Sequence, residues 1–225
     1  MPQQDSLSLE WHGVEEGPEE HGVREVRLQT NNGAIDCRYH PAAESDLAIL
    51  WVFGAGGGLG GPAGGLYIRL AEVMTADRVA SLRLDYRRPG QLTDCVLDVL
   101  LGVAYLETLG RKRVVLVGHS FGGAVVINAG ALSDNVIAVA ALSSQSHGTE
   151  AVEDLSPRAV LLIHGEDDEV LPTRCSNDIY SRAQEPKQLI TYPGCRHGLD
   201  DCRREVDRDL TLWLHDVFSS AAPRV

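Results

Sequence analysis

A serine flanked by two glycines lies where an apolar run gives way to small residues, in the sequence Gly-His-Ser-Phe-Gly of residues 118–122. The run before it, residues 114–117, contains only valine and leucine and predicts a buried strand, and the residues after it favour a helix. A tight strand-to-helix turn requires glycine on both sides, because a side chain there would collide with its neighbours. Such a turn, a nucleophile elbow, exposes the hydroxyl at its apex. Ser120 is therefore predicted to be a nucleophile.

A nucleophilic serine needs a base and an acid that orients the base, and both occur later in the chain. Residues 159–164 predict a buried strand, which an acidic segment containing Asp167 and Asp168 follows. Residues 188–192 predict another strand, and His197 comes soon after it. Catalytic groups of open α/β sheets gather at the C-terminal ends of the strands. The order serine, aspartate, histidine is that of a hydrolase triad on such a sheet.

From about residue 46 to about residue 217, the chain resembles the α/β-hydrolase superfamily, and within it the small dienelactone-hydrolase-like serine hydrolases. Residues 164–172, His-Gly-Glu-Asp-Asp-Glu-Val-Leu-Pro, are similar to the family's acid loop, His-Gly-x-x-Asp-x-x-Val-Pro. Residues 194–198 match Gly-x-x-His-Gly, a usual setting for the base. The resemblance implies Asp168 as the triad acid, with Asp167 as the weaker alternative, and His197 as the base.

The resemblance also implies an oxyanion hole, and it has one clear departure. One donor is expected to be the backbone N–H of Phe121, and the second that of Ala55 in the glycine-rich loop after a strand at 47–53, with Gly56 as the alternative. The loop does not fit a dinucleotide motif, because leucine stands where the third glycine belongs. Dienelactone hydrolase itself has a cysteine nucleophile, whereas position 120 is serine, so that enzyme's substrate is not carried over.

These residues predict a serine hydrolase that cleaves a small carboxylic ester through an acyl-enzyme. Two alternatives stay open: a thioesterase, amidase or acyltransferase with the same triad, and a non-catalytic interaction module with an α/β-hydrolase fold. No cofactor is expected. Cys175, Cys195, His197 and Cys202 match no standard zinc spacing, so no metal is expected either.

Composition restricts the partners and the location. The net charge of −12 argues against nucleic acid and anionic membranes, and no apolar run approaches the ~20 residues of a membrane span. The first residues carry no secretion signal, and the five cysteines are odd in number. We therefore expect a cytoplasmic protein that acts on a small-molecule ester. We expect no disulfide between Cys195 and Cys202. The sequence leaves the oligomeric state open.

Alternating strand and helix patterns predict one α/β domain over residues 1–225. It should have the α/β-hydrolase fold, with a mostly parallel central sheet, helices on both faces, and an antiparallel hairpin at the first edge around residues 31–33. Residues 1–20 are expected to be loose or to add a strand through residues 7–9. No large lid is expected, because only about sixteen residues, 143–158, separate two consecutive strands. The remaining expected strands are 23–29, 34–39, 80–85 and 136–142, and the expected helices are 66–75, 93–109 and 202–218.

Four other polar residues near these motifs have more ordinary interpretations. His119 is expected to pack along the turn, and His164 to be a structural histidine. Arg87 and Arg88 follow a strand and could reach an anionic substrate group, but we expect both to face solvent.

Overall fold

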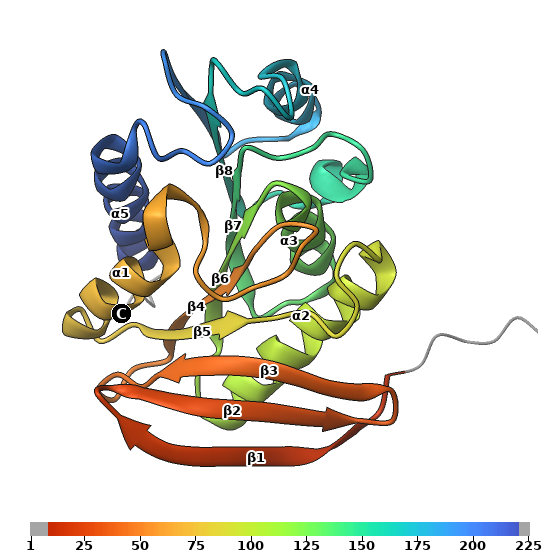
Figure 1. The fold of residues 1–225 in the computed structure, drawn as a ribbon, viewed down its shortest axis with the longest axis vertical. Coiled ribbons are helices and arrows are strands. Elements are labelled where there is room, and N and C mark those ends of the chain that lie inside the picture. The colour runs from red at the N-terminus through yellow and green to blue at the C-terminus, as the bar shows by residue number, and fades with distance from the viewer. Residues whose placement is uncertain (1–8, 221–225) are drawn as a thin grey trace, which may run out of the picture.

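The most apolar segments of the chain form the centre of a nine-stranded sheet (Figure 1). The computed structural model describes residues 9–220. The strand order in the sheet is β1-β2-β3-β5-β4-β6-β7-β8-β9. The strands are β1 (Trp11–Glu20), β2 (Val23–Thr30), β3 (Gly33–His40), β4 (Leu47–Val52), β5 (Ala80–Leu84), β6 (Arg113–His119), β7 (Val136–Leu142), β8 (Ala159–Gly165) and β9 (Lys187–Tyr192).

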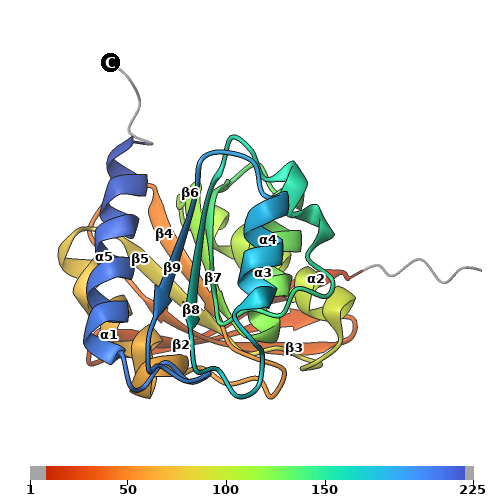
Figure 2. The same ribbon diagram turned by 90° about the horizontal axis from the view of Figure 1, so that it is seen from above.

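Helices cover both faces of the sheet, as the alternating pattern predicts (Figure 2). They are α1 (Pro62–Ala76), α2 (Leu92–Thr108), α3 (Phe121–Leu132), α4 (Arg174–Arg182) and α5 (Arg203–Ser220). Helices α1 and α5 lie on one face, and α2, α3 and α4 lie on the other (Figure 2). Successive residues of a strand point to opposite faces, so Leu50 joins the core under α2 and α3, and Trp51 joins the core under α1 and α5. A strand buried on both faces must be apolar throughout, which explains the continuous apolar runs.

Six neighbouring strands are parallel: β5, β4, β6, β7, β8 and β9. The first three strands form the antiparallel edge. The prediction for the N-terminal segment was wrong in part: residues 11–20 form the ten-residue strand β1, which pairs with β2. Its glutamates are exposed at the sheet edge, and only isolated apolar residues such as Trp11 and Val14 pack against the core. Residues 7 and 8 of the other predicted strand lie outside the described residues, and Leu9 is not in a strand.

Two helices differ from their predicted bounds. Helix α1 begins at Pro62, but residues 63–65 have left-handed backbone angles, so its regular part begins near the predicted residue 66. Helix α4 was not predicted, because it is mostly polar and buries only Ser176 and Ile179. The connection between β7 and β8 contains one short 3-10 helix (Glu150–Asp154). Within residues 9–220, no helix is both long and apolar enough to cross a bilayer.

Candidate active site

The predicted turn forms between β6 and α3. Ser120 has φ 57° and ψ −120°, a backbone conformation that is strained for a residue with a side chain. A Cβ atom on Gly118 would lie 2.1 Å from the carbonyl oxygen of Gly122, and one on Gly122 would lie 2.3 Å from that of Phe53. Both glycines are therefore needed for the close approach of the two backbones. The packed backbone on either side keeps Ser120 in its strained conformation.

The structure brings Ser120, His197 and Asp168 together from three separate loops. The Oγ atom of Ser120 lies 3.1 Å from Nε2 of His197, and Nδ1 of His197 lies 2.8 Å from Oδ2 of Asp168. Both distances are within hydrogen-bond range. The three loops follow β6, β8 and β9, whose C-terminal ends meet at one edge because the strands are parallel. The side chain of Asp168 is fully buried and that of His197 is 14% exposed.

The structure places Asp168, and not its neighbour Asp167, beside the imidazole. Oδ1 of Asp168 accepts hydrogen bonds from the backbone N–H groups of Val170 (2.9 Å) and Leu171 (2.7 Å). Burial favours the neutral carboxyl, but the hydrogen bonds from His197 and from these amides outweigh it and lower the pKa of Asp168 below its usual value. Asp168 is therefore held as a carboxylate. Asp167 is exposed, and its backbone N–H donates a 3.0 Å hydrogen bond to the carbonyl of Cys195.

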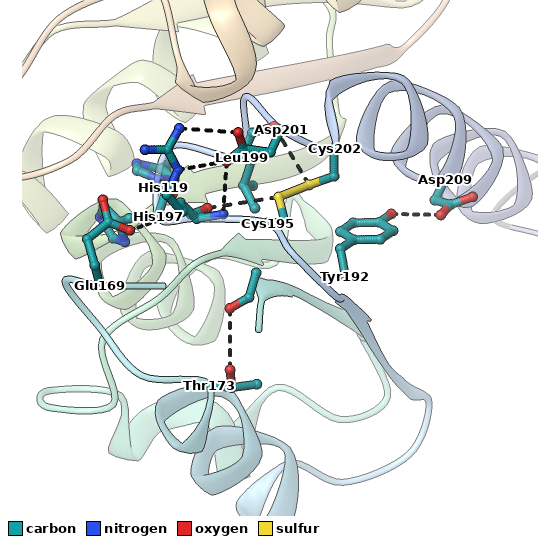
Figure 3. The surroundings of a disulfide bond; sticks show 12 residues. His119, Glu169, Thr173, Tyr192, Cys195, His197, Leu199, Asp201, Cys202 and Asp209 are labelled. Carbon is teal, nitrogen blue, oxygen red and sulfur yellow. Dashed lines mark hydrogen bonds and ion pairs between the residues drawn. A yellow bond between two sulfur atoms is a disulfide. The ribbon is translucent and has the colours of Figure 1, made fainter. Parts of the chain in front are cut away.

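The loop that carries His197 is cross-linked, and our expectation about its cysteines was wrong. Cys195 and Cys202 form a disulfide that joins the end of β9 to the start of α5 (Figure 3). The expectation rested on a reducing cytoplasm, where disulfides are rare, but the tight loop between Cys195 and Cys202 brings their sulfur atoms together. Their Cα atoms are 5.7 Å apart, an ordinary separation for a disulfide. The other cysteines, Cys37, Cys95 and Cys175, are free.

Glu169 also holds the His197 loop, and sequence reasoning gave it no role. Its carboxylate accepts a 3.2 Å hydrogen bond from the backbone N–H of His197 (Figure 3). This contact between the acid loop and the base loop lowers the pKa of Glu169, after a hydrogen bond to its own backbone, which is the larger cause. No pattern in the sequence identifies such a contact, because its partner is a backbone group 28 residues away.

His119 and His164 pack as structural histidines, as expected. His119 is 4% exposed, its ring stacks on Phe53, and its Nε2 lies 3.0 Å from the backbone carbonyl of His197. The ring of His164 is fully buried between the hydroxyl of Ser176 and the carbonyl of Leu171, at 2.7 and 2.8 Å. Burial lowers the pKa of both histidines, to about 4 for His119.

The glycine-rich loop after β4 passes close to the nucleophile. A Cβ atom on Gly54 would lie 3.5 Å from Cβ of Ser120, which places the backbone of the loop beside the hydroxyl. A 3.0 Å hydrogen bond from the N–H of Gly57 to the carbonyl oxygen of Gly54 closes the turn that follows. Ala55 and Gly56 are exposed in this turn. Phe121 is the first residue of α3, so its N–H has no partner within the helix. The two expected donors, Phe121 and Ala55, stay predictions.

One of the two arginines after β5 does not face solvent, and that expectation was wrong for Arg87. Its side chain is 2% exposed and is paired with the buried Asp98 of α2 at 2.5 Å. Arg88 is half exposed, as expected. Nearby Asp85 has a structural contact, because its carboxylate accepts a 2.7 Å hydrogen bond from the N–H of Gly58. Arg87 is therefore committed to the fold and is not available to a substrate anion.

Solved structures with a similar fold include α/β hydrolases. Dienelactone hydrolase from Anabaena variabilis has a TM-score of 0.74 at 18% identity, over 87% of this chain and 99% of that chain. Est1E from Butyrivibrio proteoclasticus also has a TM-score of 0.74 at 18% identity, over the same shares of the two chains. At these identities the likeness shows the fold, which is the α/β-hydrolase fold.

The chain belongs to the dienelactone hydrolase family, which residues 65–211 match. Membership supports a hydrolase activity. The protein YfhR of Escherichia coli is 30% identical over 129 residues, which are 47% of this chain and 45% of that protein. The bifunctional esterase/perhydrolase DCH of Acinetobacter calcoaceticus is 35% identical over 72 residues, or 32% of this chain and 26% of that enzyme. The matches thus cover less than half the length of these relatives.

Proposed function

We propose that this protein is a serine hydrolase that cleaves small carboxylic esters, with Ser120 as nucleophile, His197 as base and Asp168 as the orienting acid. The observation that carries the proposal is the continuous chain of hydrogen bonds from Ser120 through His197 to Asp168, with distances of 3.1 and 2.8 Å. The strained backbone of Ser120 supports it, because unusual conformations at polar residues concentrate at functional sites.

The roles of the two imidazole nitrogens follow from their partners. Asp168 is a carboxylate and can only accept, so Nδ1 of His197 carries the proton and Nε2 has the free lone pair. When the Oγ atom of Ser120 attacks the ester carbonyl carbon, its proton passes to Nε2. The imidazolium that forms is stabilised by the buried carboxylate. It then donates the proton to the leaving alkoxide as the carbon–oxygen bond of the ester breaks.

The negative charge that develops on the carbonyl oxygen needs hydrogen-bond donors. We assign this part to the backbone N–H groups of Phe121 and Ala55. The N-terminal end of α3 begins directly after Ser120, so the positive end of the helix dipole also favours the charge. In the second half of the cycle, His197 takes a proton from water, the hydroxide attacks the acyl carbon, and Ser120 leaves with the proton returned.

The substrate class is drawn from chemistry and from relatives. Alkoxides leave more readily than amines, so esters are favoured over amides. The Acinetobacter relative is named an esterase and a perhydrolase, which is consistent with ester substrates. None of these steps uses a metal or a cofactor. The cytoplasmic location stays a prediction, and the Cys195–Cys202 disulfide removes one argument for it.

The test combines a covalent probe with a substrate panel. The purified protein should react with a fluorophosphonate at Ser120, located by mass spectrometry, and should hydrolyse short-chain aryl and alkyl esters faster than matched thioesters and amides. Labelling at another residue would contradict the assignment of the nucleophile. Labelling of Ser120 with faster thioester or amide turnover would move the protein to one of those classes. An absence of both labelling and turnover would favour a non-catalytic module.

A further inference from the structure

His119 makes contacts that an apolar residue at the same place could not make. It directly precedes the nucleophile, and its Nε2 lies 3.0 Å from the backbone carbonyl oxygen of His197. Its ring contacts two others: Phe53 stacks on it at a centroid distance of 5.2 Å, and the centroid of the His197 ring is 4.8 Å away. Figure 3 shows His119 beside His197. One side chain therefore bridges the strand that carries the nucleophile and the loop that carries the base.

The partners of the ring define its protonation. A carbonyl oxygen only accepts, so Nε2 of His119 must carry a proton. Its Nδ1 is buried and, among the described residues, has no hydrogen-bond partner. A second proton on Nδ1 would add a buried donor without a partner, and burial accordingly lowers the pKa of His119 to about 4. At neutral pH the ring is thus an uncharged donor with one specific acceptor.

We propose that His119 is a positioning residue for the base: its Nε2–H donates to the main chain of His197 and keeps the imidazole of His197 within hydrogen-bond distance of Ser120. The inference rests on the proposed function. The unpartnered Nδ1 supports it, since a purely space-filling role would be served better by an apolar ring without an orphaned acceptor.

The neutral state of His119 matters for the reaction as well. His197 becomes an imidazolium during the attack, and its ring is only 4.8 Å from that of His119. A second cation at that distance would oppose the proton transfer, because like charges in a buried site repel strongly. The buried, neutral ring of His119 can therefore hold the base loop beside β6 without raising the barrier to proton transfer from Ser120 to His197.

Together with Glu169, His119 fixes both polar groups of the His197 backbone. The N–H of His197 donates to the carboxylate of Glu169 at 3.2 Å, and its carbonyl accepts from His119 at 3.0 Å. The contact to Glu169 is exposed and competes with water, whereas the contact to the buried His119 is partly shielded from it. The His119 contact should hold the loop more firmly, because a hydrogen bond away from water is stronger.

The test replaces the donor and keeps the packing. His119→Phe retains a ring against Phe53 but removes the N–H, and His119→Gln places an amide N–H close to the position of Nε2. We expect His119→Phe to lower kcat by roughly 10–100-fold with KM within twofold of wild type, because small displacements of catalytic groups cost this much. His119→Gln should recover most of kcat.

Thermal unfolding separates positioning from a general structural role. His119→Phe should unfold within a few degrees of wild type near pH 7, because it removes an unpartnered buried acceptor but also the hydrogen bond to the His197 carbonyl, and these two effects oppose each other. The rate of fluorophosphonate labelling of Ser120 should fall in parallel with kcat, since labelling needs the same activation by His197.

Two results would overturn the inference. One is a His119→Phe variant with kcat within twofold of wild type. The other is a His119→Gln variant as impaired as His119→Phe, because the N–H would then not be the cause. In both cases the wild type still labels and hydrolyses esters, and the proposed function stands. A wild type that neither labels at Ser120 nor hydrolyses any ester overturns the proposed function, and this inference with it.

Discussion

At the scale of single residues, the carboxylate of Asp168 determines how the site works. It is fully buried, and it accepts hydrogen bonds from His197 and from two backbone amides. His164 approaches the same Oδ2 atom at 3.1 Å. A buried carboxylate with this many donors stays ionised, and its orientation is fixed by the amides and not by His197 alone. Asp168 can therefore hold the imidazole in one tautomer.

The adjacent aspartates provide a matched pair for testing this role. We expect Asp168→Asn to lower kcat by about 10⁴-fold, because a carboxamide cannot select the Nδ1–H tautomer of His197. Asp167→Asn should be close to wild type, since the side chain of Asp167 is exposed and its backbone N–H is unchanged. Steady-state kinetics on the best ester of the panel gives the comparison. Equal losses in the two variants would argue against Asp168 as the orienting acid.

At the scale of elements, the apolar strands and the order of the site residues were predictable from the sequence, and polar edge elements were not. The buried strands are continuous apolar runs, so β7 was predicted with its observed bounds and β4 to within one residue. The edge strand β1 was missed because its exposed glutamates mask the alternation. The Arg87–Asp98 pair was missed because it joins residues of two different elements, and only the fold brings them together.

The disulfide is a second feature that required the fold, and it leads to a stability prediction. Cys195→Ser/Cys202→Ser should reduce the free energy of unfolding by about 2–3 kcal/mol, the value that loop entropy gives for a short cross-linked loop. Denaturant unfolding without reductant measures it. Cys175→Ser, which removes a free thiol, is the control and should unfold like wild type. Equal stability of the double variant and the control would show that the cross-link contributes nothing.

The glycines of the nucleophile turn give a second stability prediction, in which a substitution adds an atom to a packed site. Gly122→Ala places a Cβ atom 2.3 Å from the carbonyl oxygen of Phe53, which is backbone and cannot move aside cheaply. We expect it to lose at least about 1–3 kcal/mol of stability, as overpacked sites do, together with most of the activity. Gly56→Ala meets no atom within 4 Å and should stay within about 0.5 kcal/mol of wild type. Thermal unfolding of both variants decides; a stable Gly122→Ala would mean that the turn is looser than described.

At the scale of the whole molecule, three buried histidines couple the fold to pH. Burial lowers the pKa of His40 and of His119 to about 4 and also lowers that of His164, and the neighbouring Arg83 adds to the effect at His40. The rings of His40 and His119 are neutral in the folded protein at pH 5–6, whereas an exposed histidine in the unfolded chain titrates near ~6.5. Between the two pKa values only the unfolded chain binds the proton. Stability must therefore fall as the pH decreases from about 6.5 towards 4.

The contribution of one histidine is obtained by comparing the pH dependence of stability in a variant with that of wild type. The other titrating groups cancel in this comparison, including Asp98, whose pKa is raised by burial. His119→Phe removes one group that protonates only on unfolding. The slope of its unfolding free energy against pH between 4.5 and 6 should be shallower than that of wild type by up to about 1.4 kcal/mol per pH unit, the value for one proton. Denaturant unfolding at intervals across this range measures both slopes, with His215→Gln as the control at an exposed histidine that pairs with Asp77 on the surface. Parallel curves for wild type and His119→Phe would mean that His119 is protonated in the folded protein, and the neutral donor assigned to it would have to be abandoned.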